Sequence, residues 1–182
     1  MEYSLHQRGR ASIDFLADLR NLSDRLEKFT DDQAQAAGIN ADELPDDPDA
    51  LQQKVTPVLE AMPEFQARWK TGVLSNADDG YLHPLLDRIG WKFPVALSSE
   101  GVGAYKPLPA AFQRVLTELG VGAEEAVYVG DTLYDDILGA KGVGMRSAWI
   151  NRDGAAHDPL MPVPDFEIRS LTELPALLEA AS

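Results

Sequence analysis

The chain has 182 residues, of which 45% are hydrophobic, and a formal net charge of −14, which suits one sizeable buried core and a small accessory lobe. Such an acidic chain is a poor partner for nucleic acid, because phosphate backbones are bound by clustered Lys and Arg. The chain has no cysteine, which excludes disulfides and cysteine nucleophiles. No segment approaches the ~20 apolar residues of a membrane span or resembles a signal peptide, so we expect a cytoplasmic protein with no membrane partner.

Two amphipathic helices are predicted in the first part of the chain. Apolar residues from Ile13 to Phe29 recur at spacings of three and four, as on one face of a helix. A second stretch, Asp49 to Trp69, has a similar pattern, with prolines that bend or split it. Residues 30–48 between them are rich in Asp, Ala and Gly and indicate a short helix and an acidic loop.

From residue 72 onward, short apolar runs alternate with helical stretches of about ten residues. This alternation predicts βαβ units and therefore an α/β fold with a parallel sheet and right-handed crossovers. The predicted strands are Gly72–Leu74, Val95–Leu97, Ala126–Val129, Ser147–Ile150 and Phe166–Ile168. The predicted helices are Tyr81–Ile89, Pro109–Leu119, Tyr134–Lys141 and Thr172–Ala180, the last one capped by Thr172.

Polar residues follow two of these runs where a ligand would bind, since open parallel sheets bind ligands at the carboxyl ends of their strands. Ser75 and Asn76 follow the first predicted strand, where a hydroxyl and backbone amides can donate to a phosphate oxygen or simply cap the next helix. Lys106 stands just before Pro107 at the start of a helix, where a positive charge opposes the helix dipole. Either a nearby anion or solvation would explain this lysine.

A third strand end carries the strongest signal, Gly130-Asp131 followed by Asp135 and Asp136. The glycine permits a tight turn, Asp131 projects from the strand end, and Asp136 lies on the first turns of the helix, where it can fold back toward the same point. Hard oxygen ligands brought together in this way suit Mg²⁺, which prefers one or two carboxylates plus waters and phosphate oxygens. The alternative is that these acids cap the helix and favour its positive end.

Together these three strand ends resemble, in order and spacing, motifs II, III and IV of the haloacid dehalogenase (HAD) superfamily. The similarity runs from about Val58 to Leu178 and favours the phosphatase-type branch, because the metal-free 2-haloacid dehalogenases typically lack the second acid of motif IV. The resemblance implies a HAD-like Rossmannoid parallel sheet flanked by helices, and an N-terminal helical cap-like segment. It implies a small phosphorylated molecule as the substrate and Mg²⁺ as the cofactor.

The resemblance also implies a role for each residue of the site. Ser75 and the Asn76 amide would bind the phosphoryl group, and Lys106 would bind it and neutralise its charge. Asp131 and Asp136 would hold Mg²⁺, with Asp135 nearby. Such groups supply the positioning and charge stabilisation on which phosphoryl transfer depends.

Motif I of the family, a strand followed by Asp-x-Asp that includes the nucleophile, has no counterpart here. Asp14 and Asp18 are four residues apart, follow no apolar run and lie in a helical pattern typical of a solvated face. We therefore assign residues 1–62 to the cap-like segment and residues 63–182 to the α/β core, and expect the central nucleophile strand to be missing. The strands ending at Ser75 and Gly130 must then pair directly, or another segment must fill the slot.

Three hypotheses about function follow. The first is a Mg²⁺-dependent phosphatase of small phosphorylated metabolites, catalytically impaired unless its nucleophile comes from other sequence or from an unexpected residue. The second is a protein that binds phosphate and Mg²⁺ without turnover, since loss of a covalent nucleophile removes most of the rate. The third is a fragment of a longer phosphatase, and a 2-haloacid dehalogenase ranks below all three. The N-terminal amphipathic helix further suggests a homo-oligomer.

Overall fold

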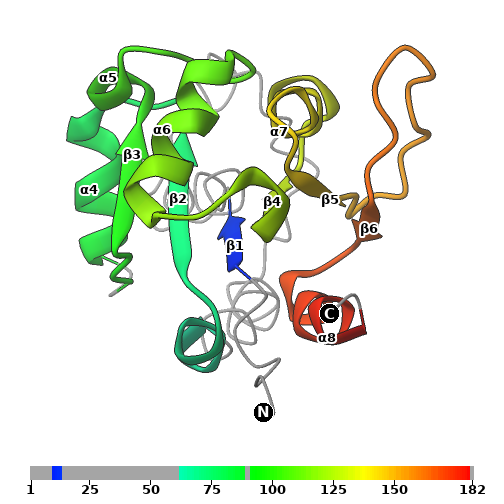
Figure 1. Ribbon diagram of the computed structural model, residues 1–182, viewed down its shortest axis with the longest axis horizontal. Helices are drawn as coiled ribbons and strands as arrows, with labels where there is room; N and C mark the ends of the chain where they lie inside the picture. Colours follow the sequence, from blue (N-terminus) through cyan, green and yellow to red (C-terminus); the bar gives the residue numbers. More distant parts are fainter. Residues whose placement is uncertain (1–9, 14–61, 89–90, 181–182) are drawn as a thin grey trace, which may run out of the picture.

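A six-stranded parallel sheet organises the computed structural model, which describes residues 10–13, 62–88 and 91–180 (Figure 1). The strand order is β3-β2-β1-β4-β5-β6, and every neighbouring pair is parallel. The predicted α/β fold with a parallel sheet is therefore confirmed. The strands are β1 (Arg10–Ile13), β2 (Thr71–Ser75), β3 (Val95–Ser98), β4 (Ala126–Gly130), β5 (Arg146–Ile150) and β6 (Phe166–Ile168).

Strands β2 and β4 are buried along their whole length, which explains why they read as continuous apolar runs rather than as an alternating pattern. Successive side chains nevertheless point to opposite faces of the sheet. Val73 and Val127 pack in the core on one face, whereas Leu74 and Tyr128 pack in the core on the other. All five strands predicted from the sequence are present, each within one residue of the predicted ends.

The centre of the sheet is occupied by β1, which lies between β2 and β4 (Figure 1). Its register runs from Arg10 opposite Ala126 to Ile13 opposite Val129. The expectation that the central strand is missing is therefore wrong, and another segment fills the slot. The sequence hid this strand because Arg10 and Ser12 break the apolar run that a buried strand usually shows.

Of the predicted cap-like segment, residues 1–62, the structure describes residues 10–13 and 62. Arg10–Ile13 belong to the core sheet, although we assigned them to the cap-like segment. Residues 1–9 and 14–61 lie outside the described residues, and with them nearly all of the predicted helix Ile13–Phe29 and the acidic loop. Of the second predicted helix, residues 62–68 are helical. The cap-like segment itself stays a prediction.

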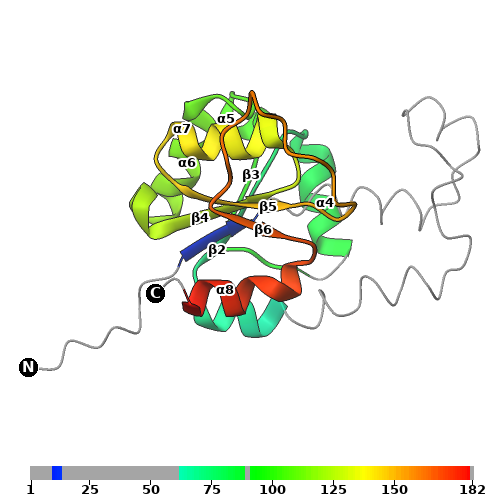
Figure 2. The ribbon, with the colours of Figure 1, turned by 90° about the vertical axis from the view of Figure 1, so that its right-hand side faces the viewer.

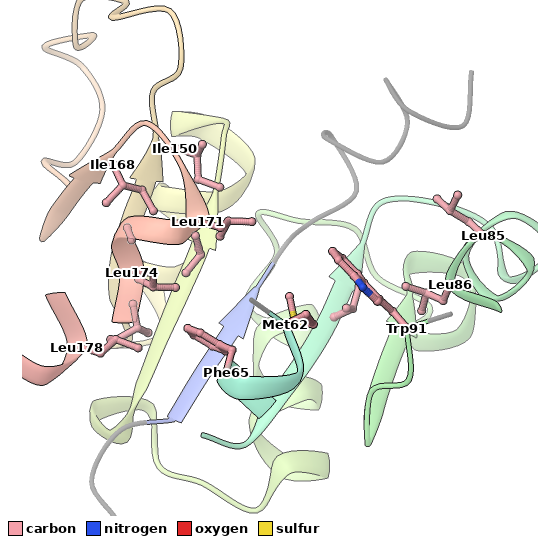
Figure 3. Packing of buried hydrophobic residues seen from close by; sticks show 14 of the residues in the cluster. Met62, Phe65, Leu85, Leu86, Trp91, Ile150, Ile168, Leu171, Leu174 and Leu178 are labelled. Carbon is pink, nitrogen blue, oxygen red and sulfur yellow. The ribbon is translucent and has the colours of Figure 1, made fainter. Parts of the chain in front are cut away.

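Helices cover both faces of the sheet, so that the core has three layers (Figure 2). Residues 62–68, α4 (Asp79–Arg88) and α8 (Leu174–Ala180) bury their apolar side chains on one face, and Figure 3 shows this cluster. On the other face lie α5 (Ser99–Val102), α6 (Pro109–Leu119) and α7 (Gly139–Gly142). In the part of the chain that is described, no helix has the length and hydropathy needed to cross a membrane.

Two predicted helices differ from the observed ones in detail. The stretch Tyr134–Lys141 is a π-helical turn, η3 (Leu133–Leu138), that continues into α7. At the C-terminus, α8 is preceded by a short turn, η4 (Leu171–Glu173), which is capped by Ser170 rather than by Thr172. The Ser170 side chain accepts from the Thr172 N–H, and Glu173 reaches back to the Ser170 N–H at 2.9 Å, which is a capping box.

The edge strand β6 is held to β5 by Asp165, the residue just before it. Lys141 Nζ donates to Asp165 Oδ1 at 2.7 Å, and the Ser147 N–H donates to Asp165 Oδ2 at 2.7 Å. Burial alone would raise the pKa of Asp165, but the hydrogen bonds from Lys141 and Ser147 outweigh it and hold this pKa below its usual value. The charged form of Asp165 is therefore favoured by folding.

We expect Asp165→Asn to lower the free energy of unfolding by about 1 kcal/mol at neutral pH, because it removes a charge-assisted hydrogen bond to Lys141. A lowered pKa contributes stability above the unfolded-state pKa of about 3.9 and loses it as the pH falls through the folded-state value, so the difference should narrow below about pH 4. Urea unfolding at several pH values measures this. Asp87→Asn, at an exposed position of α4, is the control, and a pH-independent difference would contradict the prediction.

Candidate active site

A buried ion pair lies at the carboxyl edge of the sheet, between Lys106 and Asp136. Their side chains are 5% and 1% exposed, and Lys106 Nζ lies 2.8 Å from Asp136 Oδ1. Thr132 donates to the other carboxylate oxygen, Oδ2, with its N–H and with its hydroxyl, both at 2.9 Å. A buried charge without such partners would be strongly destabilising, so each member of this cluster depends on the others. Asp136 is therefore the nearby anion that was predicted for Lys106. The alternative, that the Lys106 ammonium group is solvated, is wrong.

Asp136 can reach the strand end because Gly130 has no side chain. A Cβ atom on Gly130 would lie 2.5 Å from Asp136 Oδ2 and closer still to the Asp136 Cβ and Cγ atoms. After Gly130 the chain enters the π-helical turn η3, in which the N–H groups of Asp136 and Ile137 both donate to the Thr132 carbonyl at 3.2 Å. Such turns are frequent at functional sites. The predicted fold-back of Asp136 is thus observed.

Lys106 is positioned by Asn76, which follows β2. The Lys106 N–H donates to Asn76 Oδ1 at 2.8 Å, and Asn76 Nδ2 donates to the Lys106 carbonyl at 3.1 Å. These two hydrogen bonds hold the backbone of Lys106 next to the carboxyl end of β2. From the sequence we predicted a role only for the backbone amide of Asn76. The role of its side chain in holding the Lys106 backbone was missed.

Tyr128 lies beneath the ion pair on β4 and is fully buried. Lys106 Nζ is 5.7 Å from the centre of its ring, and the Tyr128 hydroxyl donates to the Leu74 carbonyl at 3.5 Å. Burial, followed by the negative charge of Asp136, raises the pKa of Tyr128 well above its usual value. Burial of the ring therefore favours the neutral phenol.

Asp131 and Asp135 add negative charge to the same edge. Burial, and then the charge of Asp136, raises the pKa of both carboxyl groups, while the positive charges of Arg152 and Lys106 partly offset this at Asp131. The Asp131 carbonyl is held by the Trp149 indole N–H at 2.9 Å. Proximity of like charges raises the free energy of the ionised forms, and a divalent cation at Asp131 would relieve it.

The residues present fit Mg²⁺ in part. Among the described residues no group of three or more acidic or His side chains converges as a ready-made metal cage. Mg²⁺ does not require one, since it is usually held by one or two carboxylates together with water and substrate oxygens. Asp131 is the better candidate ligand, because both oxygens of Asp136 already accept hydrogen bonds from Lys106 and Thr132. The predicted metal roles of Asp131, Asp136 and Asp135 stay predictions.

Ser75 is the last residue of β2 and is buried, in register with Ser98 at the end of β3. The structure therefore brings Ser75, Asn76, Lys106, Asp131 and Asp136 to one edge of the sheet, as the sequence predicted. Thr132 was missed, although its position four residues before Asp136 is a signal for a side-chain contact on a helical turn. The phosphate-binding role of Ser75 stays a prediction.

A profile of the haloacid dehalogenase-like hydrolases matches residues 2–144, well over half of the chain. The chain belongs to this family. The match includes the strand that fills the centre of the sheet and the whole of the Lys106–Asp136 site.

Curated relatives of this chain include phosphatases and a dehalogenase. A glyceraldehyde 3-phosphate phosphatase of Pyrococcus furiosus is 39% identical over 48% of this chain and 36% of its own length. Human N-acylneuraminate-9-phosphatase is 41% identical over 41% of this chain and 31% of its own length. Haloacetate dehalogenase H-2 of Moraxella is 31% identical over 57% of this chain and 46% of its own length. The chain thus spans from about a third to a half of these relatives.

Solved structures of similar fold cover nearly the whole chain. A HAD phosphatase from Thermococcus onnurineus is 27% identical, with a TM-score of 0.65 and coverage of 93% of this chain and 97% of its own. A 2-haloacid dehalogenase from Pseudomonas syringae is 26% identical, with a TM-score of 0.63 and coverage of 96% and 99%. YfnB from Bacillus subtilis, bound to magnesium, has a TM-score of 0.69 and covers 94% of this chain and 99% of its own. At 22% identity, this match shows a similar fold and nothing more.

Gly130→Ala should destabilise the protein by roughly 2–4 kcal/mol, because the added methyl group displaces Asp136 and leaves Lys106 buried without its counter-charge. Chemical unfolding measures this loss. Gly80→Ala, in α4, is the matched control, because a Cβ there meets nothing within 4 Å and should leave stability unchanged or raise it slightly. Equal stabilities for the two variants would show that the close approach at Gly130 does not hold the ion pair.

Proposed function

We propose that this hydrolase is a Mg²⁺-dependent phosphatase of small phosphorylated metabolites. The observation that carries the proposal is the buried Lys106–Asp136 pair, set beside Asp131 at the edge of the sheet where ligands bind. The second acid of the turn after β4 supports phosphate-ester chemistry over dehalogenation, because the metal-free dehalogenases of the family typically lack it. The names of several relatives agree with this choice.

In such a reaction each residue has a defined task. Lys106 offsets negative charge on the phosphoryl oxygens, and the Ser75 hydroxyl donates to one of them, both of which favour the transition state of phosphoryl transfer. Asp131 would hold the metal, and Asp136 fixes the position of the Lys106 ammonium group by pairing with it at 2.8 Å. When bound, Mg²⁺ supplies further neutralisation of the phosphate and helps to orient it.

The enzyme hypothesis requires a carboxylate nucleophile at the centre of the sheet. The strand β1 ends at Ile13, so Asp14 follows the central strand directly in the sequence, although this strand carries no apolar run. Asp14 and Asp18 themselves lie outside the described residues. A carboxylate directly after the central strand is what the enzyme hypothesis needs, and Asp14 is therefore its best candidate.

A second candidate function is the binding of Mg²⁺ and phosphate without turnover. It is favoured by the sequence after β1, Asp14-Phe15-Leu16, which has no second aspartate two positions on to act as acid and base. In either case we propose a cytoplasmic protein whose partner is a small phosphorylated molecule, and self-association through the N-terminal region is a further part of the proposal.

We expect the purified chain to release inorganic phosphate from an aryl phosphate only when Mg²⁺ is present. Asp131→Asn and Lys106→Met should each lower kcat/KM by roughly a hundredfold or more, since each removes a charge that acts on the transition state. Asp14→Asn should abolish turnover, whereas Asp18→Asn, its neighbour in the same segment, should not.

The outcomes separate the candidates. A folded protein that binds phosphate in the presence of Mg²⁺ but never turns over supports the second function. Release of phosphate that needs no metal and survives Asp131→Asn would contradict the proposed role of the strand-end acids.

A further inference from the structure

A cavity of about 390 Å³ lies at the amino ends of β2 and β3, away from the candidate active site at their carboxyl ends. Its walls are residues 66–71, which lead from a helix into β2, together with Lys92 and Pro94, which precede β3. Figure 1 shows the helical residues 62–68 at this end of β2. The four residue steps from Thr71 to Ser75 span about 13 Å at ~3.3 Å each. The cavity is therefore separate from the candidate active site, and its volume suits a small molecule.

This cavity is basic although the chain is acidic. Arg68, Lys70 and Lys92 are three of the eight described residues that line it, and none of these eight is acidic. The whole chain has 30 Asp and Glu against 16 Lys and Arg. Glu179 of α8 pairs with Arg68 and offsets its charge, so the excess of positive charge comes from Lys70 and Lys92. A local excess of this kind attracts anions.

Hydrogen bonds hold the walls of the cavity together. Gln66 Nε2 donates to the Lys92 carbonyl at 2.8 Å, which ties the helical residues 62–68 to the segment before β3. Lys70 Nζ donates to the Leu119 carbonyl at the end of α6, at 3.2 Å. An ammonium group has three N–H donors, and this bond uses one of them. A cavity whose walls are already fixed loses little order when a ligand binds.

One wall of the cavity is apolar. Trp69 is half-buried, and the centre of its ring lies 4.8 Å from that of Phe65. The Arg68 guanidinium stacks on the Trp69 ring, with its central carbon 4.2 Å from the ring centre, an arrangement that stabilises the position of both groups. Pro94 adds further apolar surface. The organic body of a ligand therefore has a surface to contact beside the positive charges.

We propose that this cavity is a second anion-binding site, which takes a small organic molecule whose phosphate group lies between Lys70 and Lys92. Ammonium groups bind phosphate as compact positive charges. A doubly charged phosphate is favoured over a carboxylate, because more than one cationic side chain lines the cavity. The inference goes beyond the proposed function and does not depend on it, since the cavity and the candidate active site share no residue.

The test is a titration with phenylphosphonate, a dianion that phosphatases do not hydrolyse, in the presence of EDTA and followed by NMR. The indole N–H signals of Trp69 and Trp149 report on the two sites separately, because Trp69 lines the cavity and Trp149 bonds to Asp131. Trp69→Phe and Trp149→Phe assign the two signals. We expect the Trp69 signal to shift and saturate, and benzoate, with a single charge, to bind about tenfold or more weakly.

Lys70→Gln and Lys92→Gln should each weaken the binding of phenylphosphonate about fivefold or more, and both residues are exposed, so the variants should fold normally. Arg114→Gln is the matched control, since it removes the same charge from an exposed position of α6 and should leave the affinity unchanged. Asp131→Asn should leave the Trp69 response unchanged as well.

Three outcomes would overturn the inference. The first is a shift confined to Trp149, which would place the probe in the candidate active site. The second is wild-type affinity in both lysine variants. The third is equal affinity for benzoate and phenylphosphonate, which would contradict the assignment to a phosphate group. None of these outcomes bears on the phosphatase proposal, which is tested by turnover.

Discussion

The Lys106–Asp136 pair is the interaction on which the rest of the site depends. Two opposite charges are buried together at the end of a parallel sheet, which is costly unless both are fully paired. Full pairing requires a glycine at position 130 so that Asp136 can approach, Thr132 to satisfy its second oxygen, and Asn76 to hold the backbone of Lys106. The ends of β2 and β4 and the loop before α6 are thereby held in one arrangement, at the edge where we propose that phosphate and Mg²⁺ bind.

Much of this fold could be predicted because most of its strands carry short apolar runs, and β2 and β4 are buried along their whole length. Such strands read as short apolar runs, and β2, β3, β4, β5 and β6 were all identified in this way. The central strand β1 escaped, since Arg10-Ala11-Ser12-Ile13 carries no such run, and its membership of the sheet depends on long-range pairing with β2 and β4. The place of β1 in the sheet is decided by these tertiary contacts, and the local pattern of apolar residues does not predict them.

The sequence was enough to predict which residues lie at the strand ends of the site. It was not enough to predict which of these side chains bond to one another. The order Ser75, Lys106, Asp131 and Asp136 followed from the resemblance and from the rule that ligands meet the carboxyl ends of strands. That Asp136 would pair with Lys106 could not be foreseen, because the pairing depends on the close approach at Gly130 and on the π-helical turn. The role of Asn76 could not be foreseen either, because it depends on two hydrogen bonds to Lys106, thirty positions away.

The central role of the ion pair is tested most directly by a double-mutant cycle on Lys106→Met and Asp136→Leu, with the free energy of unfolding as the measured quantity. Each single variant leaves a buried charge without its partner and should lose about 3–5 kcal/mol. The double variant removes both charges and should lose less than the sum of the two by at least about 2 kcal/mol. Losses that add to within about 0.5 kcal/mol would mean that the two residues act independently and that the pair does not organise the site.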